Sequence, residues 1–238
     1  MSYCRVAPGH PFHGPYHDRE YGFPLREDAA LFERLVLEIN QAGLSWLTIL
    51  KKRASFVAAY DGFDLDRIAR YGARERARLL ADPGIIRNRL KIDAAIENAR
   101  RLLAIRDRYG SFAAWLDAHH PRSRAHWVAL FRQTFRFTGG EITSEFLLST
   151  GYLPGAHSRS CPVLVAIARH RPPWMTASTG ARATVAGRRA PSRAASRERS
   201  AAGSRGRRGA PATPAGVAAA TPPAGRRRRR RRRGSTRR

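Results

Sequence analysis

The point along the chain at which large apolar side chains stop limits the folded part more than any other feature. Trp174 is the last aromatic residue, and residues 175–238 consist largely of Ala, Arg, Gly, Pro, Ser and Thr, with an unbroken arginine run at 226–233. Such a composition cannot bury enough apolar surface to offset the entropy of ordering the chain. We therefore predict one domain over residues 1–174, long enough for a sizeable core, and a disordered basic tail over 175–238.

The formal net charge of +27 is divided unevenly between these two parts. Residues 1–174 hold 26 Lys and Arg against 17 Asp and Glu, so most of the excess positive charge lies in the tail. A positive domain favours a polyanionic partner, with nucleic acid the first candidate. The tail has two interpretations, a solvated extension or a non-specific phosphate-binding arm.

Several protein classes do not fit the sequence. The chain has no run of 18 apolar residues, as a transmembrane helix requires, and residues 1–12 lack the apolar stretch of a signal peptide. Two cysteines are too few for a disulfide-stabilised secreted scaffold. We therefore expect a cytoplasmic protein.

The spacing of apolar residues predicts an all-α fold. Asp28 and Ser45 are expected to cap helices, Asp64 to open a short one, and the Gly-, Pro- and His-rich residues 7–17 to form a loop. The predicted helices cover 28–42, 46 to about 53, 74–81, 88–108, 112–119, 124–135, 141–150 and 162–169.

The segment Asp82-Pro83-Gly84-Ile85-Ile86-Arg87 separates two of these helices. A tight turn at Gly84 would present backbone N–H groups at the start of the next helix, where phosphate is attracted, with Arg87 and Arg89 beside them. This pattern suits a helix-hairpin-helix, a clamp on the DNA backbone that does not read sequence. An ordinary turn between two helices fits the same residues.

Glu38 lies at the edge of an apolar helical stripe and is followed closely by a turn and Trp46. A carboxylate in that position is usually solvated. Together with the indole ring it could instead line a cleft for a flat cation with amino groups, such as an alkylated purine.

Two pairs of possible metal ligands stand near the two ends of the predicted domain. Cys4 and His17 form one pair, and His157 and Cys161 form the other. Two cysteines and two histidines make a closed tetrahedral zinc set, which would fasten the two ends together. Two buried free thiols are the alternative.

Five stretches of the chain resemble, in order, the bacterial family of DNA-3-methyladenine glycosylase I. They are YHDREYG at 16–22, QAGLSWLTILKKR at 41–53, GIIRNRLKI at 84–92, FRFTGGEI at 135–142, and GYLPGAH with CPV at 151–163. The resemblance covers residues 3 to about 174 and implies the all-α helix-hairpin-helix glycosylase fold, with a zinc site joining the N- and C-terminal loops.

The resemblance also implies roles for particular residues. Glu38 would read the edge of a flipped 3-methyladenine base in a pocket lined by Tyr16, Trp46 and Tyr21, the last standing where the family often has Trp. A structural zinc ion would be held by Cys4, His17, His157 and Cys161, and the DNA backbone would be contacted by Gly84, Ile85, Ile86, Arg87 and Arg89.

The implied function is base excision repair. The expected enzyme is a monomeric, nucleoid-associated hydrolase that excises 3-methyladenine from double-stranded DNA. No lysine is placed as a Schiff-base nucleophile, so we expect it to be monofunctional. The alternatives are a broader alkylpurine glycosylase, a non-enzymatic zinc-stabilised DNA-binding module, and an RNA-binding protein, the last supported only by the tail.

Overall fold

The computed structural model describes residues 3–176, and this part of the chain contains helices and no strands. The predicted tail therefore lies outside the described residues, apart from its first two. None of the helices described is both long enough and apolar enough to cross a membrane. In chain order they are α1 (Tyr3–Val6), α2 (His13–Arg19), α3 (Asp28–Gln41), α4 (Trp46–Ala59), the 3-10 turn η1 (Asp61–Phe63), α5 (Leu65–Ala69), α6 (Ala73–Ala81), α7 (Arg89–Tyr109), α8 (Phe112–His119), α9 (Arg124–Thr134), α10 (Gly140–Ser149) and α11 (Val163–Arg169).

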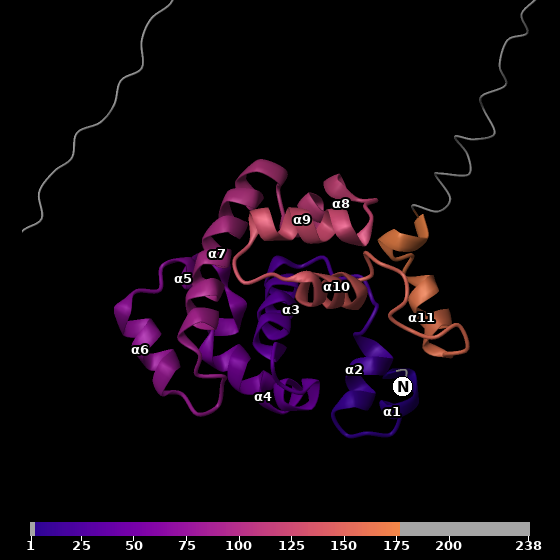
Figure 1. Cartoon of the computed structure of the whole chain (residues 1–238), viewed down its shortest axis with the longest axis horizontal. Coiled ribbons are helices and arrows are strands. Elements are labelled where there is room, and N and C mark those ends of the chain that lie inside the picture. Colours follow the sequence, from indigo (N-terminus) through magenta and orange to yellow (C-terminus); the bar gives the residue numbers. More distant parts are fainter. Residues whose placement is uncertain (1–2, 177–238) are drawn as a thin grey trace, which may run out of the picture. The chain divides into compact units, whose positions relative to one another are not determined.

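Helix α3 is the element around which the others pack. It contacts α4, α7, α8 and α10, and Figure 1 shows it crossed by α10. Leu31, Leu35 and Ile39 repeat every four residues and are at most 1% exposed. Because most other side chains of α3 are also buried, this helix is part of the core rather than an amphipathic surface helix.

An aromatic cluster joins α8, α9 and α10 on one side of α3. Phe112 stacks on Phe146 with ring centroids 5.7 Å apart, and Trp115 and Phe131 pack around them. These side chains are at most 4% exposed. Large buried rings contribute much of the apolar surface removed from water, so this cluster fixes α10 against α8 and α9.

Helices α6 and α7 form a helical hairpin, as the sequence predicts. The connecting residues 82–88 pack against α4, where Lys52 Nζ donates a hydrogen bond of 2.7 Å to the carbonyl oxygen of Pro83. A Cβ atom at Gly84 would lie 2.8 Å from Cβ of Ser55. Only glycine therefore allows this close approach of the turn to α4.

The predicted caps are confirmed in part. Ser45 accepts a hydrogen bond from the backbone N–H of Thr48, and Asp64 accepts one from Arg67, as N-caps do. Asp28 is not the cap of α3, because it is the first helical residue and its carboxylate instead accepts the N–H of Phe112 at 2.8 Å.

The prediction of a loop throughout 7–17 is wrong, because α2 begins at His13. Pro15 falls in the first turn of this helix, where a backbone N–H has no helical partner and proline is tolerated. The ring of His10 accepts the N–H groups of Phe12 and His13, each at 3.1 Å, and so satisfies the start of the helix from outside.

Candidate functional site

A cavity of about 650 Å³ opens where α1, α2, α3, α4 and α10 meet. Its volume falls in the range of small-molecule pockets. The predicted pocket residues from four separate positions in the sequence all lie on its wall. The described residues that line it are Tyr3, Tyr16, Tyr21, Glu38, Gln41, Ala42, Gly43, Trp46, Glu141, Ile142 and Glu145.

Aromatic rings form one side of this cavity. The ring centroids of Tyr16 and Trp46 are 5.2 Å apart, and those of Tyr16 and Tyr21 are 5.7 Å apart. Tyr3 closes the group, 5.4 Å from Tyr21. Such a group of rings offers flat apolar faces and electron-rich surfaces that suit a flat cationic ligand.

Glu38 enters the cavity wall from the last turns of α3. Its side chain is 4% exposed, yet it forms no hydrogen bond or salt bridge with any described residue. Burial raises its pKa from 4.5 to about 8, the charge of Arg34 opposes this, and the charge of Glu145 adds to it. A buried carboxyl group without a partner is costly, so a ligand that donates hydrogen bonds or carries positive charge would relieve it.

The cation nearest to Glu38 along its own helix is engaged elsewhere. Arg34 is 2% exposed and donates hydrogen bonds to the hydroxyl of Tyr16 at 3.0 Å and to Glu20 at 3.1 Å. Glu20 is shared with Arg53, which lies 2.7 Å away. This network holds the Tyr16 ring in position, because the guanidinium group also lies 4.8 Å from the ring centroid.

The turn between α3 and α4, at the edge of the cavity, is held by Lys91. Its ammonium group donates hydrogen bonds to the carbonyl oxygens of Asn40 at 2.9 Å and of Ala42 at 2.7 Å. A cation at the C-terminus of a helix satisfies its last carbonyl groups and complements the helix dipole. Lys91 thereby fixes the segment that leads from Glu38 to Trp46.

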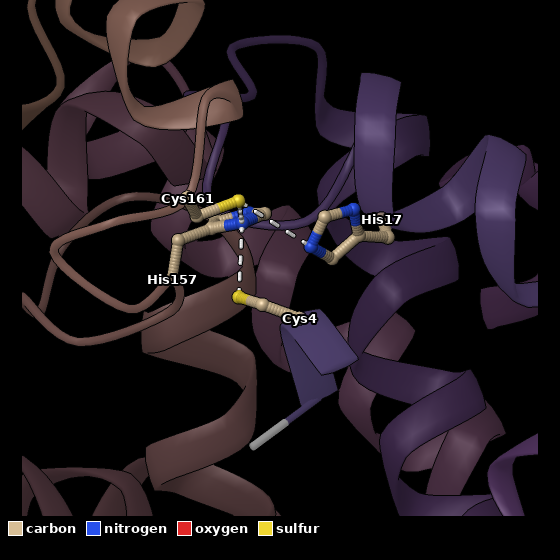
Figure 2. Close-up of side chains that lie close together, drawn as sticks. All are labelled: Cys4, His17, His157 and Cys161. Carbon is tan, nitrogen blue, oxygen red and sulfur yellow. Dashed lines mark hydrogen bonds between the residues drawn. The ribbon is translucent and has the colours of Figure 1, made fainter. Parts of the chain in front are cut away.

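The predicted metal ligands form a second cluster beside the cavity. The ligand atoms of Cys4, His17, His157 and Cys161 all lie within 4.8 Å of one another. Figure 2 shows the four side chains pointing toward one another, Cys4 and His17 from the N-terminal segment and the other two from the segment before α11. The fold thus brings together ligands that are 153 residues apart in the sequence.

The donor set and its spacing fit a tetrahedral metal ion. Nδ1 of His157 lies 3.6 Å from Sγ of Cys4 and 3.3 Å from Sγ of Cys161, and the latter is 3.7 Å from Nε2 of His17. Zinc bonded tetrahedrally at its usual distances to sulfur and nitrogen would separate two such ligands by about 3.5 Å. The four residues can therefore hold a metal ion with little rearrangement.

The second ring nitrogen of each histidine is also satisfied. Nε2 of His157 donates to the carbonyl oxygen of Tyr21 at 2.7 Å, and Nδ1 of His17 donates to Asp18 at 2.6 Å. In this arrangement the other nitrogen of each ring carries no proton, so its lone pair faces the cluster, as binding to a metal ion requires.

The cluster of Cys4, His17, His157 and Cys161 and the cavity are held by the same segments of the chain. Cys4 and His17 directly follow Tyr3 and Tyr16 in the sequence. His157 donates a hydrogen bond to the backbone carbonyl oxygen of Tyr21. Each of these three predicted ligands is therefore linked to a different tyrosine of the cavity wall. Gly22 allows the segment after Tyr21 to approach closely, because it has a φ of +85° and an added Cβ would lie 3.0 Å from Ala156. Figure 1 shows α1 and α2 on the same side of α3 as α11.

The predicted DNA-backbone residues lie in the hairpin and do not line the cavity. Ile85 is 3% exposed and anchors the turn in the core, whereas the side chain of Arg89 is 79% exposed. Arg87 is also exposed, and Ile86 packs partly against the core. The backbone N–H groups of residues 85–87 form no hydrogen bond to other described residues.

Three residues of this site were missed by sequence reasoning. Tyr3 and Arg34 carry no motif that marks them, and only the fold places Tyr3 in the cavity wall and Arg34 behind it, against Tyr16. Glu145 reads as an ordinary helical carboxylate, although its position three residues after Ile142 places both on one helix face.

Comparisons with known proteins agree in pointing to one family. The family model described as methyladenine glycosylase matches residues 7–164. DNA-3-methyladenine glycosylase 1 of Escherichia coli (strain K12) is 34% identical over 170 residues, which cover 63% of this chain and 91% of the relative. The structure of 3-methyladenine DNA glycosylase I from Staphylococcus aureus, which concerns 3-methyladenine recognition, is 32% identical with a TM-score of 0.62 over 68% of this chain and 96% of that chain. A variant of a 3-methyladenine DNA glycosylase I in complex with 3-methyladenine is 30% identical, with a TM-score of 0.62 over 68% of this chain and 97% of that chain.

Proposed function

Because this chain belongs to the methyladenine glycosylase family, we propose that it excises 3-methyladenine from alkylated double-stranded DNA by hydrolysing the N-glycosidic bond, a step of base excision repair. The observation that carries this proposal is Glu38, a buried carboxyl group without a partner in a cavity walled by Tyr16 and Trp46. Methylation at N3 gives adenine a positive charge, and the cavity offers what such a base needs: aromatic faces and a carboxylate that accepts hydrogen bonds.

The chemistry needs little acid catalysis, because a cationic base is already a good leaving group. The bond between N9 and C1′ breaks, its electron pair goes to the base, and the sugar gains oxocarbenium character. A water molecule then bonds to C1′ and loses a proton, which leaves an abasic site and the free neutral base. Glu38 binds the nucleobase and stabilises its positive charge. We do not assign it the role of a general base that takes a proton from water.

The base must leave the helix to reach a cavity of this kind. Flipping a nucleotide costs a few kcal/mol and less for a damaged base, which gives part of the selectivity. The turn between α3 and α4, held by Lys91, places Trp46 beside Glu38, so stacking on the indole ring and hydrogen bonding at the base edge act together.

The α6–α7 hairpin is the proposed DNA clamp of a helix-hairpin-helix. The N–H groups of residues 85–87 have no partner among the described residues, and Arg87 and Arg89 extend into solvent beside them. Backbone N–H groups and arginines at a helix start bind phosphate and position the duplex without reading its sequence.

Zinc is the metal we propose for the cluster of Cys4, His17, His157 and Cys161, since two thiolates and two imidazoles form a closed structural zinc set. Its contribution when bound is mechanical, fastening the N-terminal segment to the segment before α11. Through Tyr3, Tyr16 and Tyr21 this also fixes one wall of the cavity.

We propose that the enzyme is monofunctional. Lys91 is bound to two carbonyl oxygens, and Lys52 to another in the hairpin. The chain has only one further lysine, Lys51, and none of the three lines the cavity. None of the three lysines is therefore placed to form a Schiff base at C1′. Strand cleavage with a borohydride-trappable intermediate would contradict this assignment.

The direct test is base release by the full chain from N-methylated duplex DNA, with Glu38→Gln and Glu38→Ala alongside. We expect release of 3-methyladenine by the wild type and a loss of about 100-fold or more in the variants, as for the removal of a group that stabilises charge. No release by the folded wild-type protein would favour the non-enzymatic DNA-binding module. Release of 3-methyladenine by both variants at the wild-type rate would support the glycosylase activity but contradict the role assigned to Glu38.

A further inference from the structure

The cavity wall carries acidic side chains and no basic ones among the described residues that form it. The three carboxylates are Glu38 from α3 and Glu141 and Glu145 from α10. This is unexpected in a chain with 45 Lys and Arg against 18 Asp and Glu. Because arginine is so abundant in this protein, a cavity wall with three glutamates and no arginine among its described residues is distinctive, and we infer that its negative charge is a specific property of the site.

Glu145 is the carboxylate that the proposed mechanism does not use. It is half-buried on the cavity side of α10, and the hydroxyl of Tyr21 donates a hydrogen bond to its Oε2 at 3.2 Å. Tyr21 is in turn held through its backbone by His157. Glu145 is thus oriented by a chain of contacts and is not a freely moving surface side chain.

The two carboxylates act on each other. The charge of Glu145 helps to raise the pKa of Glu38 to about 8, so in the empty cavity Glu38 is largely protonated at neutral pH. Burial raises the pKa of Glu145 above its ordinary value, and the hydrogen bond that Tyr21 donates offsets this only in part. Glu145 is only half-buried and accepts a hydrogen bond from Tyr21, and both features favour its charged form relative to that of the more deeply buried Glu38.

We propose that Glu145 is a specificity-determining residue, whose carboxylate, oriented by Tyr21, makes the cavity select positively charged bases over neutral bases of the same shape. This inference rests on the proposed function and extends it to a second residue. Glu38 contacts the edge of the base, whereas Glu145 acts on its charge from the opposite helix.

The neighbouring glutamate on the same helix provides a matched control. Glu141 lies one turn before Glu145, but its side chain is 87% exposed and is paired with Arg124 at 3.2 Å. Solvent and the arginine screen its charge, so the same substitution there should have little effect on a ligand inside the cavity.

The test measures binding of two free probes to the full chain by ligand-detected NMR titration. The first is 3,9-dimethyladeninium, in which a methyl group replaces the sugar and the ring keeps its positive charge. The second is its neutral 3-deaza counterpart, which has the same shape. The quantity of interest is the ratio of the two dissociation constants, and a thermal melt of each variant confirms that it is folded.

We expect the wild type to prefer the cation and Glu145→Gln to reduce this preference about tenfold, as for one charge a few ångströms away in a partly screened site. Glu145→Asp, which keeps the charge, should retain most of the preference, and Glu141→Gln should stay within twofold of the wild type. An unchanged ratio in Glu145→Gln, an equal loss in Glu145→Asp, or a wild type without preference for the cation would each overturn the inference. These outcomes are separate from base release on DNA, so a failure of the proposed function remains distinguishable.

Discussion

Glu38 and Arg34 lie one helical turn apart on α3, yet the carboxyl group of Glu38 forms no salt bridge with the guanidinium group of Arg34. Arg34 instead binds Tyr16 and Glu20. The pairing that a helix normally allows at this spacing is thus absent, and the carboxyl group faces the cavity without a partner. The predictions that concern Glu38 follow from this separation.

Replacing Glu38 with glutamine should stabilise the protein in a pH-dependent way. The folded-state pKa is about 8 against an ordinary value of 4.5, so the folded protein binds this proton more tightly than the unfolded chain. The stability linked to the proton is fully present below pH 4.5 and is lost as the pH rises through 8. We expect Glu38→Gln to be close to the wild type near pH 5 and to exceed it by about 4 kcal/mol at pH 9, measured by urea unfolding. An advantage of the same size at every pH, or an equal one in Glu141→Gln, would contradict this.

Excision should become faster as the pH rises toward 8. The cationic base carries its charge throughout this range, whereas Glu38 must lose its proton before it can stabilise that charge. We expect kcat/KM to rise up to tenfold per pH unit between pH 6 and 8 and then to level off. Glu38→Gln should show a low, flat profile. Affinity for undamaged duplex, measured at each pH, separates this effect from changes in DNA binding.

Loss of one metal ligand should affect both stability and the cavity. His157→Ala is expected to lose about one zinc ion per chain and to lower the thermal midpoint by about 10 °C. It should also weaken base binding, because His157 holds the backbone of Tyr21. Metal content by atomic emission and the melting curve check this, with the exposed His126→Ala as the control. Full zinc content in His157→Ala would show that the four side chains do not act as one site.

The close packing of the hairpin predicts that an added methyl group is harmful there. Gly84→Ala places a carbon 2.8 Å from Cβ of Ser55, so we expect a loss of about 1–3 kcal/mol of stability and weaker binding to undamaged duplex. Gly139→Ala is the matched control, since an added Cβ there meets nothing within 4 Å. Equal effects of the two substitutions on stability and DNA affinity would argue against a shaped clamp.

Helix periodicity was sufficient to predict most of the fold. The apolar spacing of α3 and the long repeat of α7 are properties of one helix, so they can be read without knowing its neighbours. The first turns of the chain were not predictable in this way. The ring of His10 binds the first N–H groups of α2 in place of the usual Ser, Thr, Asp or Asn cap. Pro15, which is typical of a loop, lies instead in the first turn of this helix.

The site was predictable where a residue type was unusual and unpredictable where it was common. Cysteine is rare in this chain, so Cys4 and Cys161 drew attention to their histidines. Glutamate is not rare, and nothing local distinguishes the half-buried Glu145 from the exposed Glu141. Their difference arises from Tyr21, which is 124 residues away and which only the tertiary fold brings into contact.

The exposed arginines of the domain and the buried carboxyl group of the cavity respond differently to added salt. At an ionic strength near 0.15 M, exposed charges are screened beyond about 8 Å, so we expect the proposed attraction of a duplex to Arg87 and Arg89 to weaken as salt is added. A base already enclosed beside Glu38, which is 4% exposed, is largely shielded from mobile ions. We therefore expect ionic strength to control how tightly the enzyme binds DNA and to have little influence on which base it retains.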